Sequence, residues 1–263
     1  MPADRKRKVI YYHDPVNDDF AGTKIKPVKI GEKYRYYNGA PVWKLMSFIL
    51  YRLIATPFVY LYARLLYGLR VKNKKAFLKV LFKGVYMYGN HTQFAMDAFV
   101  PTILSFPKKA YVVVSPDTVS LPGLKTIVGM LGAVPVPNEV KGFKPFGKAL
   151  TKMVRKGSVV TVYPEAHIWP WYTGIRPFPA GSFTYPVRDN VPVIAFVTTY
   201  RKRKILQKLP PHITVTLSDP MYPDASLPVR EAKEKLRNSV YDFMCRVASD
   251  PENYAYYEYR QVR

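Results

Sequence analysis

Cysteine and acidic side chains are scarce in this sequence of 263 residues. Cys245 is the only cysteine, which excludes an intrachain disulfide and gives no indication of an oxidising compartment. Eighteen Asp and Glu accompany forty-one Lys and Arg, so the formal net charge is +23. Such a surplus predicts a polyanionic partner: an anionic membrane surface, a phosphorylated substrate or a nucleic acid. A basic surface that serves only solubility is the alternative.

Several motifs for cofactors and catalysis are also missing. The segment Gly123-Leu124-Lys125-Thr126 lacks the second glycine of a phosphate-binding loop, and neither G-x-G-x-x-G nor G-x-S-x-G occurs. The four histidines do not have the spacing of a zinc site. We therefore expect no metal and no bound cofactor. The basic start is not followed by an apolar secretory segment, which favours a cytoplasmic location.

Aromatic residues, in contrast, are abundant. Twenty-two Tyr, fourteen Phe and three Trp make up 15% of the chain. Amphipathic aromatic rings favour the boundary between lipid and water, but rings interleaved with cations can also stack on nucleotide bases. Composition alone therefore leaves a membrane and a nucleic acid open as partners.

The chain divides into three predicted parts: a basic, tyrosine-rich arm over residues 1–40, a membrane-associating helical hairpin over 41–70, and an α/β domain over 71–263. The middle part is the most apolar, and Thr56-Pro57 is typical of an N-cap followed by proline at the first helical position. Each helix would have about 13 residues and a length of about 20 Å, too short for a bilayer core of about 30 Å. We expect the pair to lie in one leaflet. A pair of core helices and a single tilted transmembrane span are the alternatives.

Strand and helix signals alternate through the third part, which predicts an α/β fold with a largely parallel central sheet. The expected strands are Val85–Tyr88, Tyr111–Ser115, Ala133–Val136, Ser158–Tyr163, Val193–Tyr200 and Ile213–Leu217. The expected helices are Ala95–Ser105, Leu121–Leu131, Lys144–Arg155 and Pro228–Ala248.

Two segments carry candidate chemistry. In Gly84–Asp97 a strand ends in Gly-Asn and His91 follows, at the edge of an open α/β sheet where ligands gather. A neutral imidazole can take a proton from a hydroxyl if a carboxylate orients it. His91 could instead cap the helix that follows. In the second segment, the strand SVVTVY runs into Pro164-Glu165-Ala166-His167.

Together with two further segments, these blocks resemble the glycerophospholipid acyltransferase family, whose typical member is 1-acylglycerol-3-phosphate acyltransferase. The resemblance covers roughly residues 80 to 220. In order, the blocks are Asn90-His91 with Asp97, then Leu131–Val136, then Tyr163-Pro164-Glu165 with the stretch from Arg176 to Phe183, and finally Val191–Ile194.

The resemblance implies transfer of a fatty acyl group from acyl-CoA or acyl-carrier protein to the hydroxyl of a lysophospholipid. His91 would deprotonate the hydroxyl and Asp97 would orient the imidazole, with no metal and no cofactor. The expected substrate-binding residues are Asn90, Glu165, His167 and Arg176. The expected partners are these substrates and an anionic membrane surface, and the expected location is the cytoplasmic face of the cell membrane, peripheral or monotopic.

The sequence departs from the family pattern at its first block. Five residues separate His91 from Asp97, where the family has four, and Met96 stands at the expected acid position. One extra helical residue rotates a side chain by about 100°, so Asp97 reaches His91 only if a bulge or turn absorbs it. A working variant and an inactive site are both open.

Two arginines of the family pattern are also absent. The third block has Glu-Ala-His-Ile in place of Glu-Gly-Thr-Arg, and Pro137 replaces the arginine that often ends the second block. His167 or Arg176 could take over the contact with the acceptor phosphate. These losses leave open an acyltransferase for another lipid hydroxyl. A catalytically silent basic protein that binds membranes or nucleic acid is the alternative from a different class; for an acyltransferase, no nucleic-acid partner is expected.

Overall fold

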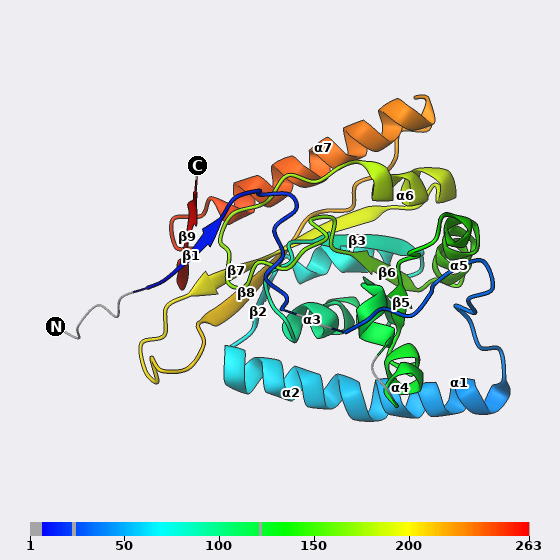
Figure 1. Ribbon diagram of the computed structural model, residues 1–263, viewed down its shortest axis with the longest axis horizontal. Helices are drawn as coiled ribbons and strands as arrows, with labels where there is room; N and C mark the ends of the chain where they lie inside the picture. Colours follow the sequence, from blue (N-terminus) through cyan, green and yellow to red (C-terminus); the bar gives the residue numbers. More distant parts are fainter. Residues whose placement is uncertain (1–6, 23–24, 121–122, 263) are drawn as a thin grey trace.

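The computed structural model describes residues 7–22, 25–120 and 123–262 (Figure 1). Residues 1–6 and 23–24 of the predicted arm and the first two residues of the helix expected from residue 121 lie outside these ranges. Seven strands form the central sheet in the order β2-β8-β7-β3-β6-β4-β5, and all neighbours are parallel except β7 and β8. The strands are β2 (Arg70–Lys72), β3 (Val85–Gly89), β4 (Ala110–Val114), β5 (Ala133–Pro135), β6 (Val159–Val162), β7 (Val193–Arg201) and β8 (His212–Leu217).

Helices cover both faces of this sheet. They are α1 (Pro41–Phe48), α2 (Thr56–Tyr67), α3 (Met96–Ser105), α4 (Lys125–Met130), α5 (Phe143–Arg155), α6 (Thr184–Asp189) and α7 (Val229–Ala248). Short 3₁₀ helices occur at Lys74–Val80, Pro116–Val119, Val140–Gly142 and Gly181–Phe183. The prediction of a largely parallel α/β sheet flanked by helices is confirmed.

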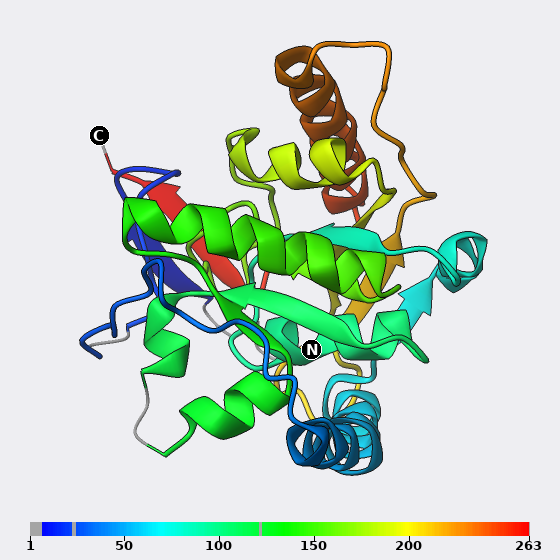
Figure 2. The ribbon, with the colours of Figure 1, turned by 90° about the vertical axis from the view of Figure 1, so that its right-hand side faces the viewer.

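Alternating side chains of the strands supply two hydrophobic cores. Val85 and Met87 of β3 face a core shared with α2 and α3, whereas Tyr86 and Tyr88 face a second core shared with α5 and α7. Figure 2 shows the N-terminal helix end-on on one side of the sheet and α5 crossing the other side. Because β3 is buried on both faces in the middle of the sheet, the chain that leaves it is held on a rigid element.

The predicted helical pair is instead one continuous helix. Residues Pro41–Tyr67 form 27 residues of helix, in which a π-helical segment, Ile49–Ala55, joins α1 to α2 (Figure 1). The prediction of a break at Thr56 is therefore wrong. Pro57 lacks a backbone N–H, and the wider turns of the π segment accommodate it, with the Thr56 N–H and hydroxyl both donating to the Tyr51 carbonyl.

One face of this helix packs on the body and the other is exposed. The buried positions are Ser47, Tyr51, Thr56, Val59, Ala63 and Tyr67. Large apolar side chains line the exposed side: Val42, Leu45, Met46, Phe48, Leu53, Ile54, Phe58, Leu61 and Leu65. At about 1.5 Å per residue the helix is about 40 Å long, so its length and composition suffice to cross a bilayer core of about 30 Å.

Tyr51 anchors the helix to the sheet. Its buried hydroxyl accepts a hydrogen bond from the Ala110 N–H (2.9 Å) and donates one to the Thr102 hydroxyl (3.1 Å). We expect Tyr51→Phe to lower the free energy of unfolding by about 1–3 kcal/mol, because the buried Ala110 N–H loses its acceptor. Urea unfolding measures the change. Tyr60→Phe is the matched control, since that side chain is exposed; equal effects of the two changes would contradict the anchoring role.

The predicted arm joins the body through a second, two-stranded sheet. Strand β1 (Lys8–Tyr12) pairs in parallel with β9 (Tyr257–Gln261), which lies near the end of α7 (Figure 1). The ring of Trp169 contacts both strands: it packs against Tyr12 of β1 and stacks on Tyr259 of β9 at a centroid distance of 5.1 Å. The arm therefore lies over the body at this point.

Candidate active site

His91 follows the carboxyl end of β3, with β6 and β7 on either side of that strand. Gly89 ends the strand, and a Cβ there would lie 2.2 Å from the Phe196 ring, so only glycine fits this close packing. Asn90 is buried, and its side-chain amide exchanges two hydrogen bonds with the backbone of Thr198 on β7, at 3.0 and 2.8 Å. These contacts fix the backbone from which His91 projects.

His91 and Asp97 are in direct contact. The His91 Nδ1 lies 2.8 Å from the Asp97 Oδ2, which also accepts the backbone N–H groups of Thr92 and Gln93 at 2.8 Å each. The extra residue between the pair is absorbed because α3 begins only at Met96, and the chain from His91 to Ala95 is not helical. The non-helical turn thus brings the carboxylate to the ring despite the longer spacing.

This geometry sets the proton positions on the imidazole. An ionised carboxylate has only acceptor sites, so His91 Nδ1 donates to Asp97 and Nε2 of the neutral ring carries the free lone pair. The side chain of His91 is 24% exposed, whereas that of Asp97 is 2% exposed. An oriented, partly accessible imidazole backed by a buried carboxylate is the arrangement of a general base.

Tyr163, the first residue of the Tyr-Pro-Glu block, supports both residues. Its ring stacks on the His91 ring at a centroid distance of 4.7 Å, and its hydroxyl donates to the backbone carbonyl of Asp97. Burial, with a smaller contribution from Asp97, raises the pKa of Tyr163 well above its ordinary value, so the hydroxyl stays protonated. The sequence gives no sign of this role, nor of the backbone donors of Thr92 and Gln93, because main-chain groups leave no signal in the residue pattern.

Glu165 and Arg176 form a buried pair beneath the His91 loop. The Glu165 Oε2 accepts the His91 N–H (3.1 Å), the Oε1 accepts the Arg176 N–H (3.0 Å), and the guanidinium lies 3.5 Å from the carboxylate. Burial raises the pKa of Glu165 and the Arg176 charge opposes this, while burial lowers the pKa of Arg176. Arg176 also donates to the carbonyl of His167 and lies over the Trp169 ring.

Three of the residues predicted to bind substrate make these buried contacts. The side chains of Asn90, Glu165 and Arg176 are buried and bonded to the protein, so they offer no surface to a substrate and instead position the chain around His91. His167 differs, because its side chain is 37% exposed and its Nδ1 lies 3.6 Å from the carboxylate of Asp19. The backbone N–H of Trp169 donates to the His91 carbonyl at 3.0 Å, which ties the aromatic run to the same loop.

An apolar pocket of about 200 Å³ lies along α3, whose first turn contains Asp97. Its lining comes from α3, the N-terminal helix, β4, β5 and neighbouring segments: Tyr51, Ala55, Val59, Ala98, Phe99, Thr102, Val112, Val114, Thr118, Val128, Leu131 and Ala133. No charged side chain is among them. The pocket is therefore suited to a hydrocarbon chain. In residues 7–22, 25–120 and 123–262, no group of three or more His, Cys, Asp or Glu side chains could hold a metal ion.

The sheet order and the helices on both faces define an open α/β fold with a histidine–aspartate pair at the carboxyl edge of its central strand. The sequence matches no protein-family model and no curated protein. Among solved structures, the fold is similar to the crystal structure of the 1-acyl-sn-glycerophosphate (LPA) acyltransferase PlsC from Thermotoga maritima, with a TM-score of 0.51 and 17% sequence identity. The match covers 79% of this chain and 97% of that one, and it shows that the two share a fold.

Proposed function

We propose that the protein is an acyltransferase that moves a fatty acyl group from acyl-CoA or acyl-carrier protein to the hydroxyl of a lysophospholipid. The observation that carries this proposal is the 2.8 Å contact between His91 and Asp97 at the edge of the sheet, close to an apolar pocket. The shared fold with an LPA acyltransferase supports the same chemistry. No cofactor takes part, because a thioester is already an activated acyl donor.

The reaction proceeds by general-base catalysis. The Nε2 of His91 takes the proton of the acceptor hydroxyl while its oxygen attacks the thioester carbonyl carbon. The new C–O bond forms, the C–S bond breaks, and the departing thiolate recovers the proton from the imidazolium. Asp97 stabilises the imidazolium through Nδ1. Help of this kind contributes about 10²–10⁴ in rate.

Of the two substrates, the acyl acceptor is the one whose identity the site constrains less. Arg176 is buried in its pair with Glu165, so it is not positioned to bind an acceptor phosphate, which favours testing other lipid hydroxyls beside 1-acylglycerol-3-phosphate. The test is an acyl-transfer assay with both donors on a panel of lysophospholipids, amino-acid lipids and glycolipids. Transfer to one acceptor class supports the proposal. If neither donor gives transfer to any acceptor, the result would favour a catalytically silent protein that binds membranes or nucleic acid.

We further propose that the protein works at the cytoplasmic face of the cell membrane, seated on anionic lipid by its N-terminal helix. The exposed apolar side of that helix and the net charge of +23 support this placement. The triple change Leu53→Ser, Phe58→Ser and Leu65→Ser removes apolar area without touching the buried face. We expect partition onto vesicles of phosphatidylglycerol and phosphatidylcholine to fall by about a hundredfold or more in flotation assays.

The control for this membrane test is a triple change at apolar positions elsewhere that are still more exposed: Phe82→Ser, Val140→Ser and Ile205→Ser. These substitutions are expected to leave flotation nearly unchanged. If both triple variants lose flotation to the same extent, binding depends on general surface hydrophobicity and the helix is not the seating element.

A further inference from the structure

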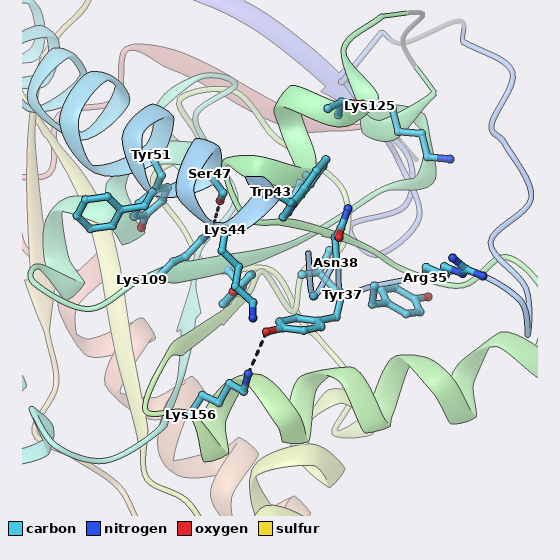
Figure 3. Close-up of a pocket in the computed structure, with 18 of the residues that line it drawn as sticks. Arg35, Tyr37, Asn38, Trp43, Lys44, Ser47, Tyr51, Lys109, Lys125 and Lys156 are labelled. Atoms are coloured by element: carbon cyan, nitrogen blue, oxygen red, sulfur yellow. Dashed lines mark hydrogen bonds between the residues drawn. The ribbon is translucent and has the colours of Figure 1, made fainter. Parts of the chain in front are cut away.

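A second and larger cavity, of about 840 Å³, lies away from His91 (Figure 3). Its walls are the first half of the N-terminal helix, α4, the edge strand β5, the start of β4, the end of α5 and residues 34–39 of the arm. None of the residues predicted for the acyl-transfer site lines it. The cavity sits at the edge of the sheet, three strands from the one that carries His91.

The charge of this cavity is of one sign. Six cations are among its lining residues, and no Asp or Glu is: Arg35, Lys44, Arg52, Lys109, Lys125 and Lys156. Among the residues that the structure describes, none of the six forms an ion pair with a carboxylate. Cations gathered around a concave space repel one another, so an anion in that space would lower the electrostatic energy.

Lys109 is the clearest example of a cation in this cavity that lacks a counter-charge. Its Nζ donates to the Ser47 hydroxyl (2.8 Å) and to the Met130 carbonyl (3.1 Å), and Figure 3 shows it extending toward Ser47. Burial, together with the nearby Arg52 charge, lowers the pKa of Lys109 to about 8. The group is thus a desolvated ammonium held by two neutral acceptors, and a bound anion would supply the missing counter-charge.

Other hydrogen-bond donors that line the cavity also have unused bonding capacity. Within the described ranges, the Arg52 Nη1 and the Tyr36 hydroxyl are buried without a hydrogen-bond partner. The Lys156 Nζ donates to the Tyr37 hydroxyl at 3.0 Å, and in Figure 3 Lys44 extends toward the same hydroxyl. A phosphate has several acceptor oxygens and can satisfy such donors together.

The surroundings point to an amphiphile. The cavity lies beside the N-terminal helix, which exposes Val42 and Leu45 outside the cavity lining, and it shares Tyr51 and Ala133 with the apolar pocket. We propose that the cationic cavity binds the phosphate headgroup of an anionic phospholipid, with a hydrocarbon chain directed toward the apolar side. The site would hold a membrane lipid separately from the acyl acceptor at His91, so it does not depend on the proposed catalytic activity.

The test uses the full chain and dihexanoylphosphatidylglycerol below its micelle concentration, followed by isothermal titration calorimetry. One site per chain is expected, with no comparable binding of dihexanoylphosphatidylcholine, whose headgroup is zwitterionic. The double variant Lys44→Gln/Lys156→Gln should weaken binding by about tenfold or more, because two charge-assisted contacts are removed. Circular dichroism establishes that this variant is folded.

Two further variants establish whether the lipid binds in this cavity. Lys204→Gln/Lys208→Gln removes the same charge at exposed positions outside the cavity and should leave binding nearly unchanged. His91→Ala should also retain binding, which distinguishes the cavity from the proposed acyl-transfer site. An equal loss in both lysine double variants, or no binding of phosphatidylglycerol, would overturn the proposal. Lysine-dependent binding of CoA in its place would assign the cavity to nucleotide phosphates and overturn the lipid assignment.

Discussion

His91→Ala is expected to reduce acyl transfer by about 10²–10⁴-fold while the protein stays folded. In the described part of the chain, His91 is the only histidine whose ring is oriented by a buried carboxylate. Alanine removes the imidazole but keeps the backbone N–H that donates to the Glu165 carboxylate. The measurement is the initial rate of ester formation with the best acceptor of the panel. Retention of full activity would refute the assignment of the base.

Two companion variants sharpen this result. Asp97→Asn keeps the size of the side chain but replaces the carboxylate that accepts from Nδ1, so we expect a loss in kcat larger than any change in KM. His13→Ala changes an exposed histidine of the arm and is expected to have full activity. A loss in His13→Ala equal to that in His91→Ala would show that histidine removal acts through general destabilisation.

Glu165→Ala is expected to have the largest effect on stability, at about 3–5 kcal/mol in the free energy of unfolding. The substitution leaves the Arg176 guanidinium buried without its counter-charge and removes the acceptor of two backbone N–H groups. Urea unfolding measures the loss. The same variant should lose activity, because the His91 backbone is then no longer held.

The double variant Glu165→Gln/Arg176→Met tests the cause of that loss. Replacing both charges removes the unpaired guanidinium, so much of the stability lost in Glu165→Ala should return. The exposed pair Lys79–Asp219, at 2.7 Å, provides the comparison, and Asp219→Ala should change stability little. If the double variant is as unstable as Glu165→Ala, the hydrogen bonds rather than the buried charge dominate.

Six of the seven strands of the main sheet, all but β2, and most helices of the α/β domain could be predicted because their hydrophobic periodicity is local. Val159–Val162 and Val193–Arg201 are buried apolar runs, and Val229–Ala248 has an amphipathic pattern. The continuous N-terminal helix could not be predicted. A proline usually indicates the start of a helix, and the sequence does not show that a π-helical turn accommodates Pro57 inside a longer helix. The pairing of β1 with β9 was not predicted because neither segment is apolar enough to indicate a strand by itself.

The candidate site was predicted in part. The contact between His91 and Asp97 depends on the residue at which α3 begins. A sequence pattern does not locate the start of a helix to within one or two residues. The roles of Glu165 and Arg176 depend on burial, because the same residues at a surface would be available to a substrate. Sequence therefore indicated which residues gather at the site, and the tertiary packing determines which of them remain accessible.

The pairing of β1 with β9 also bears on the order of folding. The two strands come from segments nearly the full length of the chain apart, so closing this contact costs more chain entropy than any pairing within the main sheet. We infer that the small sheet forms late and opens first. Trp169 packs against Tyr12 and Tyr259 of these strands, and its backbone N–H donates to the His91 carbonyl, so this late step would also complete the loop that carries His91. Amide hydrogen exchange at Trp169 would then follow the opening of β1 and β9, ahead of the main sheet.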